Sequence, residues 1–187
     1  EYYQKLLLAR AHGITRATEL MEKEIDGPWY YEQVDLGYNY RMTDIQAGLI
    51  ISQLDKLPMF SNRRKEIVAR YNEAFEKNDA IIVQEEIPES DTTRHLYILR
   101  INPDKLTINR REFFDALAAE NVCCNVHYIP VYYFPHYKRL GYEKGLCPKA
   151  EKLYDEMITL PLYYGMSDQD CDDVIMAVEK IVAYYHK

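Results

Sequence analysis

The order of strand-like and helix-like segments in the second half of the chain constrains its fold more than any other feature. Short stretches of β-branched and aromatic residues alternate with longer stretches that carry apolar residues at helical spacing. Few strands separated by helices predict an α+β fold, in which helices cover one side of a small sheet. The predicted strands are residues 95–101, 122–127 and 158–160.

Paired polar residues predict where the helices of this half begin. Asn109 with Glu112, and Ser167 with Asp170, can satisfy each other's free backbone N–H groups. They predict one helix that ends near residue 120 and another close to the C-terminus. Pro148 fits the first turn of a further helix, where no backbone N–H donor is needed. The apolar positions of the last helix recur at helical spacing and are Val174, Ile175, Val178, Ile181 and Val182.

One long bent helix, or two helices in line, is expected in the first half of the chain. Thr43 with Gln46 is another capping pair, and apolar residues recur at helical spacing on both sides of Pro58. Proline cannot donate a hydrogen bond to the preceding turn, so the helix should bend or stop near Leu57. The preceding residues, 26–41, lack helical periodicity and predict an ordered loop or short strand. The apolar positions are Ile45, Leu49, Ile50 and Leu54, then Ile67, Val68, Tyr71 and Phe75.

The composition fits one domain with a single substantial core, because 48% of the 187 residues are hydrophobic. A net charge of −7 argues against a nucleic-acid partner, since no broad basic surface exists to bind phosphates. The chain has neither a run of eighteen apolar residues nor a signal-peptide layout. Its four cysteines lack zinc-binding spacing and fit reduced thiols. We therefore expect a cytoplasmic protein without a membrane partner or a metal.

Asn39 and Arg41 form the first candidate binding cluster. They lie two positions apart in a segment expected to be extended, so their side chains should point to the same face. An amide and a guanidinium together offer neutral and charged donors that suit a phosphate group. The plainer alternative, which the spacing alone favours, is a surface loop in which Arg41 pairs with Asp35 or Asp44.

An aromatic, proline-containing loop at residues 127–137 is the second candidate. It carries His127, Tyr128 and Tyr132 among its polar and aromatic side chains. Aromatic residues with polar tips commonly line ligand sites, but such loops also pack against a core or a partner subunit. The residues alone leave both possibilities open. No serine nucleophile elbow, glycine-rich phosphate loop or zinc-protease motif occurs elsewhere in the sequence.

Four segments, in this order along the chain, resemble the DegT/DnrJ/EryC1/StrS family of sugar aminotransferases. Four colinear matches are far more specific than any single one. Within the family, the aromatic third segment is most similar to transaminases that aminate a UDP-linked 4-keto-6-deoxy hexosamine on the route to pseudaminic acid. The segments are LLARAHGITR at residues 7–16, DLGYNYRMTDIQAGL at 35–49, HYIPVYYFPHYKRLGY at 127–142 and ITLPLYYGMS at 158–167.

The resemblance implies part of a fold-type-I aminotransferase, in which a large N-terminal domain holds pyridoxal 5'-phosphate on a lysine and a small C-terminal domain completes the site. Residues 1–42 would be a remainder of the large domain and the interdomain region. Residues 43–187 would be the small domain, a small antiparallel sheet packed with helices and preceded by a long bent helix. The family's lysine lies upstream of the HGIT-like segment. The chain begins after that point and none of its lysines lies in the family's lysine motif, so the resemblance implies that it contains no catalytic residue and is inactive alone. It opens without an initiator methionine, which fits either a piece of a larger protein or a trimmed terminus.

The resemblance also assigns roles to both clusters. Asn39 matches an asparagine that reaches the cofactor phosphate of the neighbouring subunit in a homodimer. Arg41 matches an arginine near the same composite site that faces the phosphates of the nucleotide sugar. His127, Tyr128 and Tyr132 match a loop that approaches this substrate. Tyr132 stands where many members have a histidine, so the function of that histidine is not carried over.

The implied reaction transfers an amino group from glutamate, through the cofactor, to the C4 ketone of a nucleotide-linked sugar. Two alternatives remain open. One is a non-catalytic module that dimerises or binds a nucleotide sugar, and the other is part of a related sugar dehydratase, whose histidine replaces the lysine. Without the large domain, the apolar face of residues 44–57 and the aromatic residues of 29–40 should be exposed and promote self-association.

Overall fold

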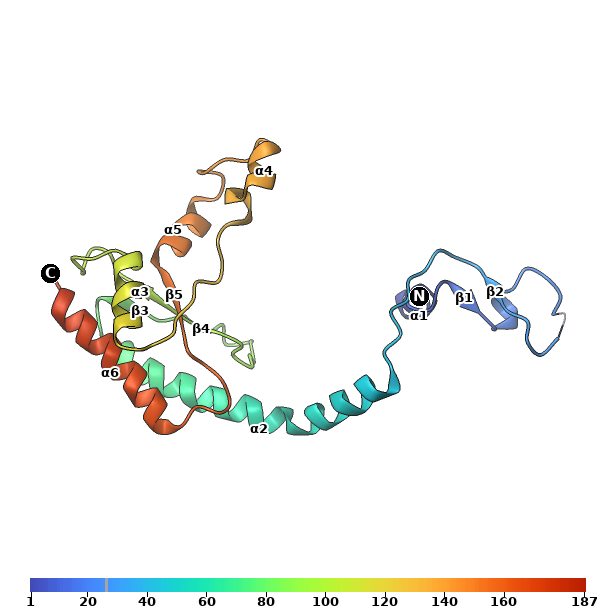
Figure 1. The fold of residues 1–187 in the computed structure, drawn as a ribbon, viewed down its shortest axis with the longest axis horizontal. Helices are drawn as coiled ribbons and strands as arrows, with labels where there is room; N and C mark the ends of the chain where they lie inside the picture. Colours follow the sequence, from blue (N-terminus) through green and yellow to red (C-terminus); the bar gives the residue numbers. More distant parts are fainter. Residues whose placement is uncertain (26) are drawn as a thin grey trace. The chain divides into compact units, whose positions relative to one another are not determined.

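The computed structural model describes residues 1–25 and 27–187, so the first residue of the predicted loop at 26–41 lies outside the described residues. The chain divides into two compact units, residues 1–56 and 57–187. The boundary falls inside one long helix, α2 (Figure 1).

The first unit contains a short antiparallel pair of strands. Helix α1 (Tyr2–Ala9) leads into β1 (Ile14–Thr15), and a single 3-10 turn, η1 (Thr18–Leu20), follows. The partner strand is β2 (Glu32–Gln33), which pairs with β1 in antiparallel register. The predicted loop before the long helix therefore does contain a short strand.

Helix α2 (Asp44–Phe75) is one continuous helix that runs through Pro58. The predicted capping pair is present at its start. The N–H of Thr43 donates to Gln46 Oε1 at 3.0 Å, and the N–H of Gln46 donates to Thr43 Oγ1 at 3.3 Å. Of the two expected arrangements, a single helix is therefore correct. Its buried face belongs to the second unit and consists of Ile67, Val68, Tyr71 and Phe75.

A three-stranded antiparallel sheet forms the centre of the second unit, in the order β3-β4-β5. The strands are β3 (Ile81–Ile82), β4 (Tyr97–Ile101) and β5 (Met157–Leu160), and Leu99 pairs with Ile158 across the last two. The first and third predicted strands are thus confirmed, with ends that differ by one or two residues. The short strand β3 has no counterpart among the predictions.

The predicted strand at residues 122–127 is wrong. Asn125 exchanges two backbone hydrogen bonds with Thr159, at N···O distances of 3.1 and 2.7 Å, but this bridge stays isolated. The N–H of Val122 instead donates to the carbonyl of Leu117 at the end of the preceding helix. The β-branched residues of this segment are therefore accommodated by one bridge and by burial of Val122, without a ladder.

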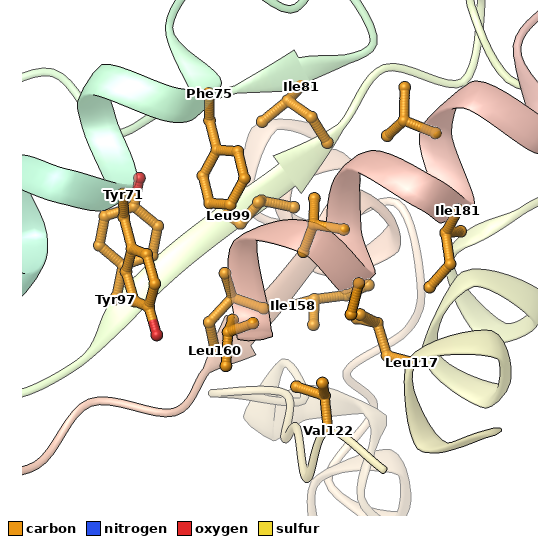
Figure 2. Packing of buried hydrophobic residues seen from close by; sticks show 14 of the residues in the cluster. Tyr71, Phe75, Ile81, Tyr97, Leu99, Leu117, Val122, Ile158, Leu160 and Ile181 are labelled. Carbon is orange, nitrogen blue, oxygen red and sulfur yellow. The ribbon is translucent and has the colours of Figure 1, made fainter. Parts of the chain in front are cut away.

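Helices cover one face of the sheet. Alternate residues of β4 (Tyr97, Leu99 and Ile101) are buried in one cluster with residues of α2, α3 (Arg110–Ala119) and α6 (Asp168–Tyr185) (Figure 2). This alternation of buried and partly exposed residues is the pattern of a strand with one covered face. The predicted α+β layer is confirmed.

Side-chain caps stabilise the N-terminal ends of α3 and α6. The predicted capping boxes of Asn109 with Glu112 and of Ser167 with Asp170 are both present.

On the other face of β4, Arg100 forms an ion pair with the buried Glu156 of α5. Helix α5 is the predicted helix that Pro148 opens. The remaining elements are the short η2 (Val131–Tyr133) and α4 (Pro135–Arg139), before α5 (Pro148–Glu156).

Within residues 1–25 and 27–187, no helix combines the length and the apolar content that a membrane span needs. The same residues contain no group of three His, Cys, Asp or Glu side chains placed to hold a metal ion. The cytoplasmic location stays a prediction.

Candidate functional site

In the first unit, the segment that carries Asn39 pairs with the HGIT-like segment along the backbone. The N–H of His12 donates to the carbonyl of Tyr38 at 3.0 Å, and the N–H of Tyr40 donates to the carbonyl of Arg10 at 3.0 Å. These two bonds lie on either side of Asn39, which forms an isolated bridge. The first two of the four resembling segments therefore build one local structure.

Two glycines allow this close approach. A Cβ atom on Gly37 would lie 2.2 Å from the backbone nitrogen of Gly13, and one on Gly13 would lie 1.8 Å from the carbonyl oxygen of Asp35. Gly13 also adopts a positive φ of 71°, a conformation that costs glycine little. The backbone that positions Asn39 thus depends on residues without side chains at both points.

Asn39 and Arg41 are both exposed. The rings of Tyr38 and Tyr40, at the alternate positions, stack with centroids 5.0 Å apart and planes 9° apart. Because alternate residues of an extended segment share a face, Asn39 and Arg41 belong to the face opposite the two tyrosines. The predicted sharing of one face by the amide and the guanidinium is consistent with this geometry.

Arg41 remains available for a ligand. Among the described residues, neither Asp35 nor Asp44 forms an ion pair with it, so the ion pair of the plainer alternative is not observed, although the segment is exposed as that alternative expects. Arg41 is the single charged side chain in the lining of a surface hollow of about 530 Å³, whose other lining residues are Tyr40, Met42, Gln46, Leu49 and Ile50. The Arg41 guanidinium beside the Gln46 amide can bind a phosphate, and the apolar side chains of the hollow suit an aromatic or apolar group attached to that phosphate.

In the second unit, His127 and Tyr128 lie next to each other at the start of the aromatic loop. His127 Nδ1 lies 3.0 Å from the hydroxyl oxygen of Thr159, which is buried on β5. The Tyr128 ring is exposed and makes an edge contact with the imidazole, with ring centroids 4.6 Å apart. The third and fourth resembling segments thus meet in this unit.

Tyr132 is buried, unlike its neighbours in the cluster. Its hydroxyl donates to Glu151 Oε1 at 2.9 Å, and the same oxygen accepts the N–H of Gly145 at 2.6 Å. Burial, together with the bond to Glu151, raises the pKa of Tyr132 to about 12. Burial also disfavours the charged carboxylate, but the hydrogen bonds from Gly145 and Tyr132 outweigh it and lower the pKa of Glu151. Tyr132 therefore fixes the loop on α5.

Arginines on α2 hold the fourth resembling segment in place. Arg63 Nη2 donates to the carbonyl of Met166 at 2.7 Å, and Arg64 Nη1 donates to the carbonyl of Leu162 at 3.3 Å. Because β5 (Met157–Leu160) overlaps the start of this segment, the two arginines also restrain the strand that carries Thr159.

Sequence reasoning missed two residues that position this cluster, Thr159 and Glu151. Thr159 lies inside the ITLPLYYGMS segment, so a signal for it was present. Glu151 lies within α5, outside all four segments, and nothing local marks it as the partner of Tyr132. Asn39 and Arg41 belong to the first unit, and His127, Tyr128 and Tyr132 to the second.

The described residues form an α+β fold with helices on one face of a small antiparallel sheet, and the capped helix α2 follows a segment with an exposed amide and an exposed guanidinium. The sequence profile of the DegT/DnrJ/EryC1/StrS aminotransferase family matches residues 1–179. The chain belongs to this family.

Relatives with similar sequences extend the match over nearly the whole chain. Protein MJ1066 of Methanocaldococcus jannaschii is 42% identical over 98% of this chain and 47% of its own length. The spore coat polysaccharide biosynthesis protein SpsC of Bacillus subtilis is 38% identical, over 97% and 47% respectively. The UDP-4-amino-4,6-dideoxy-N-acetyl-β-L-altrosamine transaminase of Campylobacter jejuni is 31% identical, over 99% and 47%. The chain spans about half the length of these relatives.

Solved structures agree with the fold. The putative sugar aminotransferase Spr1654 from Streptococcus pneumoniae, in its PMP form, matches with a TM-score of 0.82 and 32% identity, over 98% of this chain and 43% of that chain. The same protein has also been solved in a PLP form. PseC of Helicobacter pylori, an aminotransferase of pseudaminic acid biosynthesis, matches with a TM-score of 0.81 over 98% of this chain and 46% of its own. At 23% identity, this last match shows the fold alone.

Proposed function

We propose that this chain forms the C-terminal part of a pyridoxal-phosphate-dependent transaminase that transfers an amino group from glutamate to a nucleotide-linked 4-keto-6-deoxy sugar. The observation that carries the proposal is the exposure of both Asn39 and Arg41 on a segment that is hydrogen-bonded to residues 10–12. Neither side chain has a carboxylate partner among the described residues. Family membership and the transaminase named above from Campylobacter jejuni support the same function.

Each of the two residues has a proposed ligand. Asn39 would donate its amide to the phosphate of the cofactor bound in the neighbouring subunit of a homodimer. Arg41 would bind the phosphates of the nucleotide sugar, for which a guanidinium offers paired donors. The apolar wall of the hollow beside Arg41, which includes Leu49 and Ile50, suits the uncharged part of such a substrate.

The aromatic loop is the proposed contact for the sugar end of the substrate. His127 and Tyr128 are accessible to a ligand, and the hydroxyl of Thr159 fixes the orientation of the imidazole. Tyr132, whose hydroxyl is bonded to Glu151, would support this contact by holding the loop in place. We infer that the three residues act together as one substrate-facing element.

The cofactor, when bound, supplies the electron sink that amino transfer requires. The residues of this chain bind and orient, but none of its lysines lies in the lysine motif of the family. We therefore expect the 187-residue polypeptide to have no transaminase activity alone. Its proposed location is the cytoplasm.

Covalent attachment of the cofactor tests this division of roles. Purified chain is mixed with pyridoxal 5'-phosphate, reduced with borohydride and analysed by mass spectrometry. We expect no stoichiometric adduct at a single lysine, because no lysine is positioned by a cofactor site. One adduct of unit stoichiometry would show that the chain itself carries the catalytic lysine and would overturn the proposal that it only completes the site.

Substitutions in the complete gene product test the two binding roles. Asn39→Ala should raise the dissociation constant of the cofactor about tenfold or more, because a hydrogen bond to a charged group contributes about 1.5–3 kcal/mol. Arg41→Ala should instead raise KM for the nucleotide sugar. Arg16→Ala removes another exposed arginine of the first unit and is the matched control. If all three variants behave alike, the assigned roles are wrong.

A further inference from the structure

Arg94 is a buried arginine just before β4, outside the proposed active site. The residue is 5% exposed and adopts a positive φ of 53°, which is uncommon for a residue with a side chain. Its N–H donates to Thr92 Oγ1 at 3.1 Å, and its carbonyl accepts Nη1 of Arg64 at 3.2 Å. The backbone is therefore fixed on both sides of the side chain, which holds the guanidinium beneath the surface.

The guanidinium of Arg94 has few partners for a buried charge. Its Nη2 forms an ion pair with Glu86, and its Nε has no hydrogen-bond partner among the described residues. A guanidinium has five N–H donors, and leaving buried donors unused is costly. A buried polar group without partners commonly indicates a bound water, ion or ligand.

A hollow of about 270 Å³ lies beside Arg94, between α2 and the segment 86–94. Lys65 and Asn72 line its α2 side. The Asn72 side-chain oxygen accepts the hydroxyl of Tyr97 at 2.8 Å, which leaves its NH₂ group as a donor. The hollow therefore gathers an ammonium, an amide NH₂ and a guanidinium. Its size suits a small group better than a nucleotide.

The carboxylates at the rim are more exposed than the cations they neutralise. Glu86 is 56% exposed against 5% for Arg94, and Asp91 is 86% exposed against 44% for its partner Lys65. Each carboxylate already lies largely in water, so its solvation changes little when it leaves its cation. An incoming anion can thus displace both carboxylates into solvent while Arg94 keeps its position.

We propose that this hollow binds a small oxyanion, with Arg94 as the central donor and Glu86 as an intramolecular competitor. A phosphate or a carboxylate shares the required chemistry, namely two oxygens that accept parallel N–H donors of one guanidinium. The proposal does not depend on the transaminase function, since its residues lie outside both clusters described above.

Isothermal titration calorimetry of the purified chain with sodium phosphate, and separately with sodium acetate, tests the proposal at constant ionic strength maintained with sodium chloride. Saturable binding of either probe supports it and identifies the preferred oxyanion. Glu86→Gln removes the competing carboxylate and should tighten binding about two- to fivefold or more. Arg94→Lys should abolish binding, because an ammonium cannot offer paired donors.

Glu85→Gln is the matched control, because it makes the same change of charge next to Glu86 at a position that does not line the hollow. Equal effects of the two glutamine variants would reduce the result to general electrostatics and overturn the proposal. The absence of saturable heat with both probes would also overturn it. Because Glu86 is exposed, this comparison remains informative even if Arg94→Lys does not fold.

Discussion

His127 Nδ1 lies 3.0 Å from the hydroxyl oxygen, Oγ1, of Thr159. Thr159 is also the backbone partner of Asn125, two residues before His127, so two separate interactions fix the start of the aromatic loop on β5. This relationship links a residue of the third resembling segment to a residue of the fourth. The position of Thr159 in the sheet therefore sets the orientation of the His127 ring.

Thr159→Val should remove the side-chain interaction while keeping the shape of the buried residue. We expect the free energy of unfolding to fall by about 1 kcal/mol, the usual net contribution of one hydrogen bond. Urea unfolding provides the measurement, and the ¹⁵N shifts of His127 report the change at the ring. Thr93→Val, which alters an exposed threonine, is the control. Equal stability of both variants would show that the contact contributes nothing.

Two glycine substitutions should have opposite effects. Gly37→Ala places a Cβ atom 2.2 Å from the backbone of Gly13 and should destabilise the pairing around Asn39. Gly48→Ala lies on α2 with open space around the added atom, and should stabilise the helix by about 1 kcal/mol. Amide hydrogen exchange at His12 and Tyr40 would detect the first effect, and helical circular dichroism the second. Unchanged exchange in Gly37→Ala would contradict the close approach.

The ion pair of His186 with Asp79 predicts a pH-dependent contribution to stability. His186 Nε2 lies 2.9 Å from Asp79 Oδ1, and this bond raises the pKa of His186. His186 first and Lys105 second lower the pKa of Asp79 to about 2, so its carboxylate stays charged throughout the range of interest. A raised histidine pKa stabilises the fold fully below about pH 6.5, the unfolded value, and this contribution disappears as pH rises through the folded value.

The stability difference between the native chain and His186→Asn should therefore be largest near pH 5–6 and shrink above pH 6.5. Urea unfolding at several pH values measures it. His136→Asn changes a histidine on α4, outside the Asp79 cluster, and controls for the loss of any histidine. A difference that is constant from pH 5 to 9 would mean that the ion pair does not couple to folding.

The first half of α2 should drive self-association of the isolated chain. Its apolar side chains are exposed, including Ile45 at 80% and Leu49 at 64%. Exposed apolar patches commonly form interfaces. Sedimentation equilibrium should show association that the double variant Ile45→Glu/Leu49→Lys reduces, since both new residues favour helix. Met176→Lys, at an exposed position of α6, is the control. A monomeric native chain would contradict this expectation.

Local signals in the sequence were sufficient for most of the secondary structure. The pairs Thr43–Gln46, Asn109–Glu112 and Ser167–Asp170 each mark a helix start, because capping involves residues only three positions apart. Four buried positions of α6 likewise follow from its periodicity, whereas the apolar position Ile175 is only partly buried. The donors Asn39 and Arg41 could be proposed for the same reason, since their shared face depends only on their spacing.

Spacing along the chain is therefore enough to predict helices α2, α3, α5 and α6, strands β4 and β5, the family and the residues to test. The tertiary structure was needed to show that residues 122–127 form a single bridge instead of a strand, and that the hydroxyl of Tyr132 bonds to Glu151. It alone also revealed the buried guanidinium of Arg94. Each of these outcomes depends on a partner brought close by folding, such as Thr159 for Asn125, and spacing along the chain carries no information about such partners.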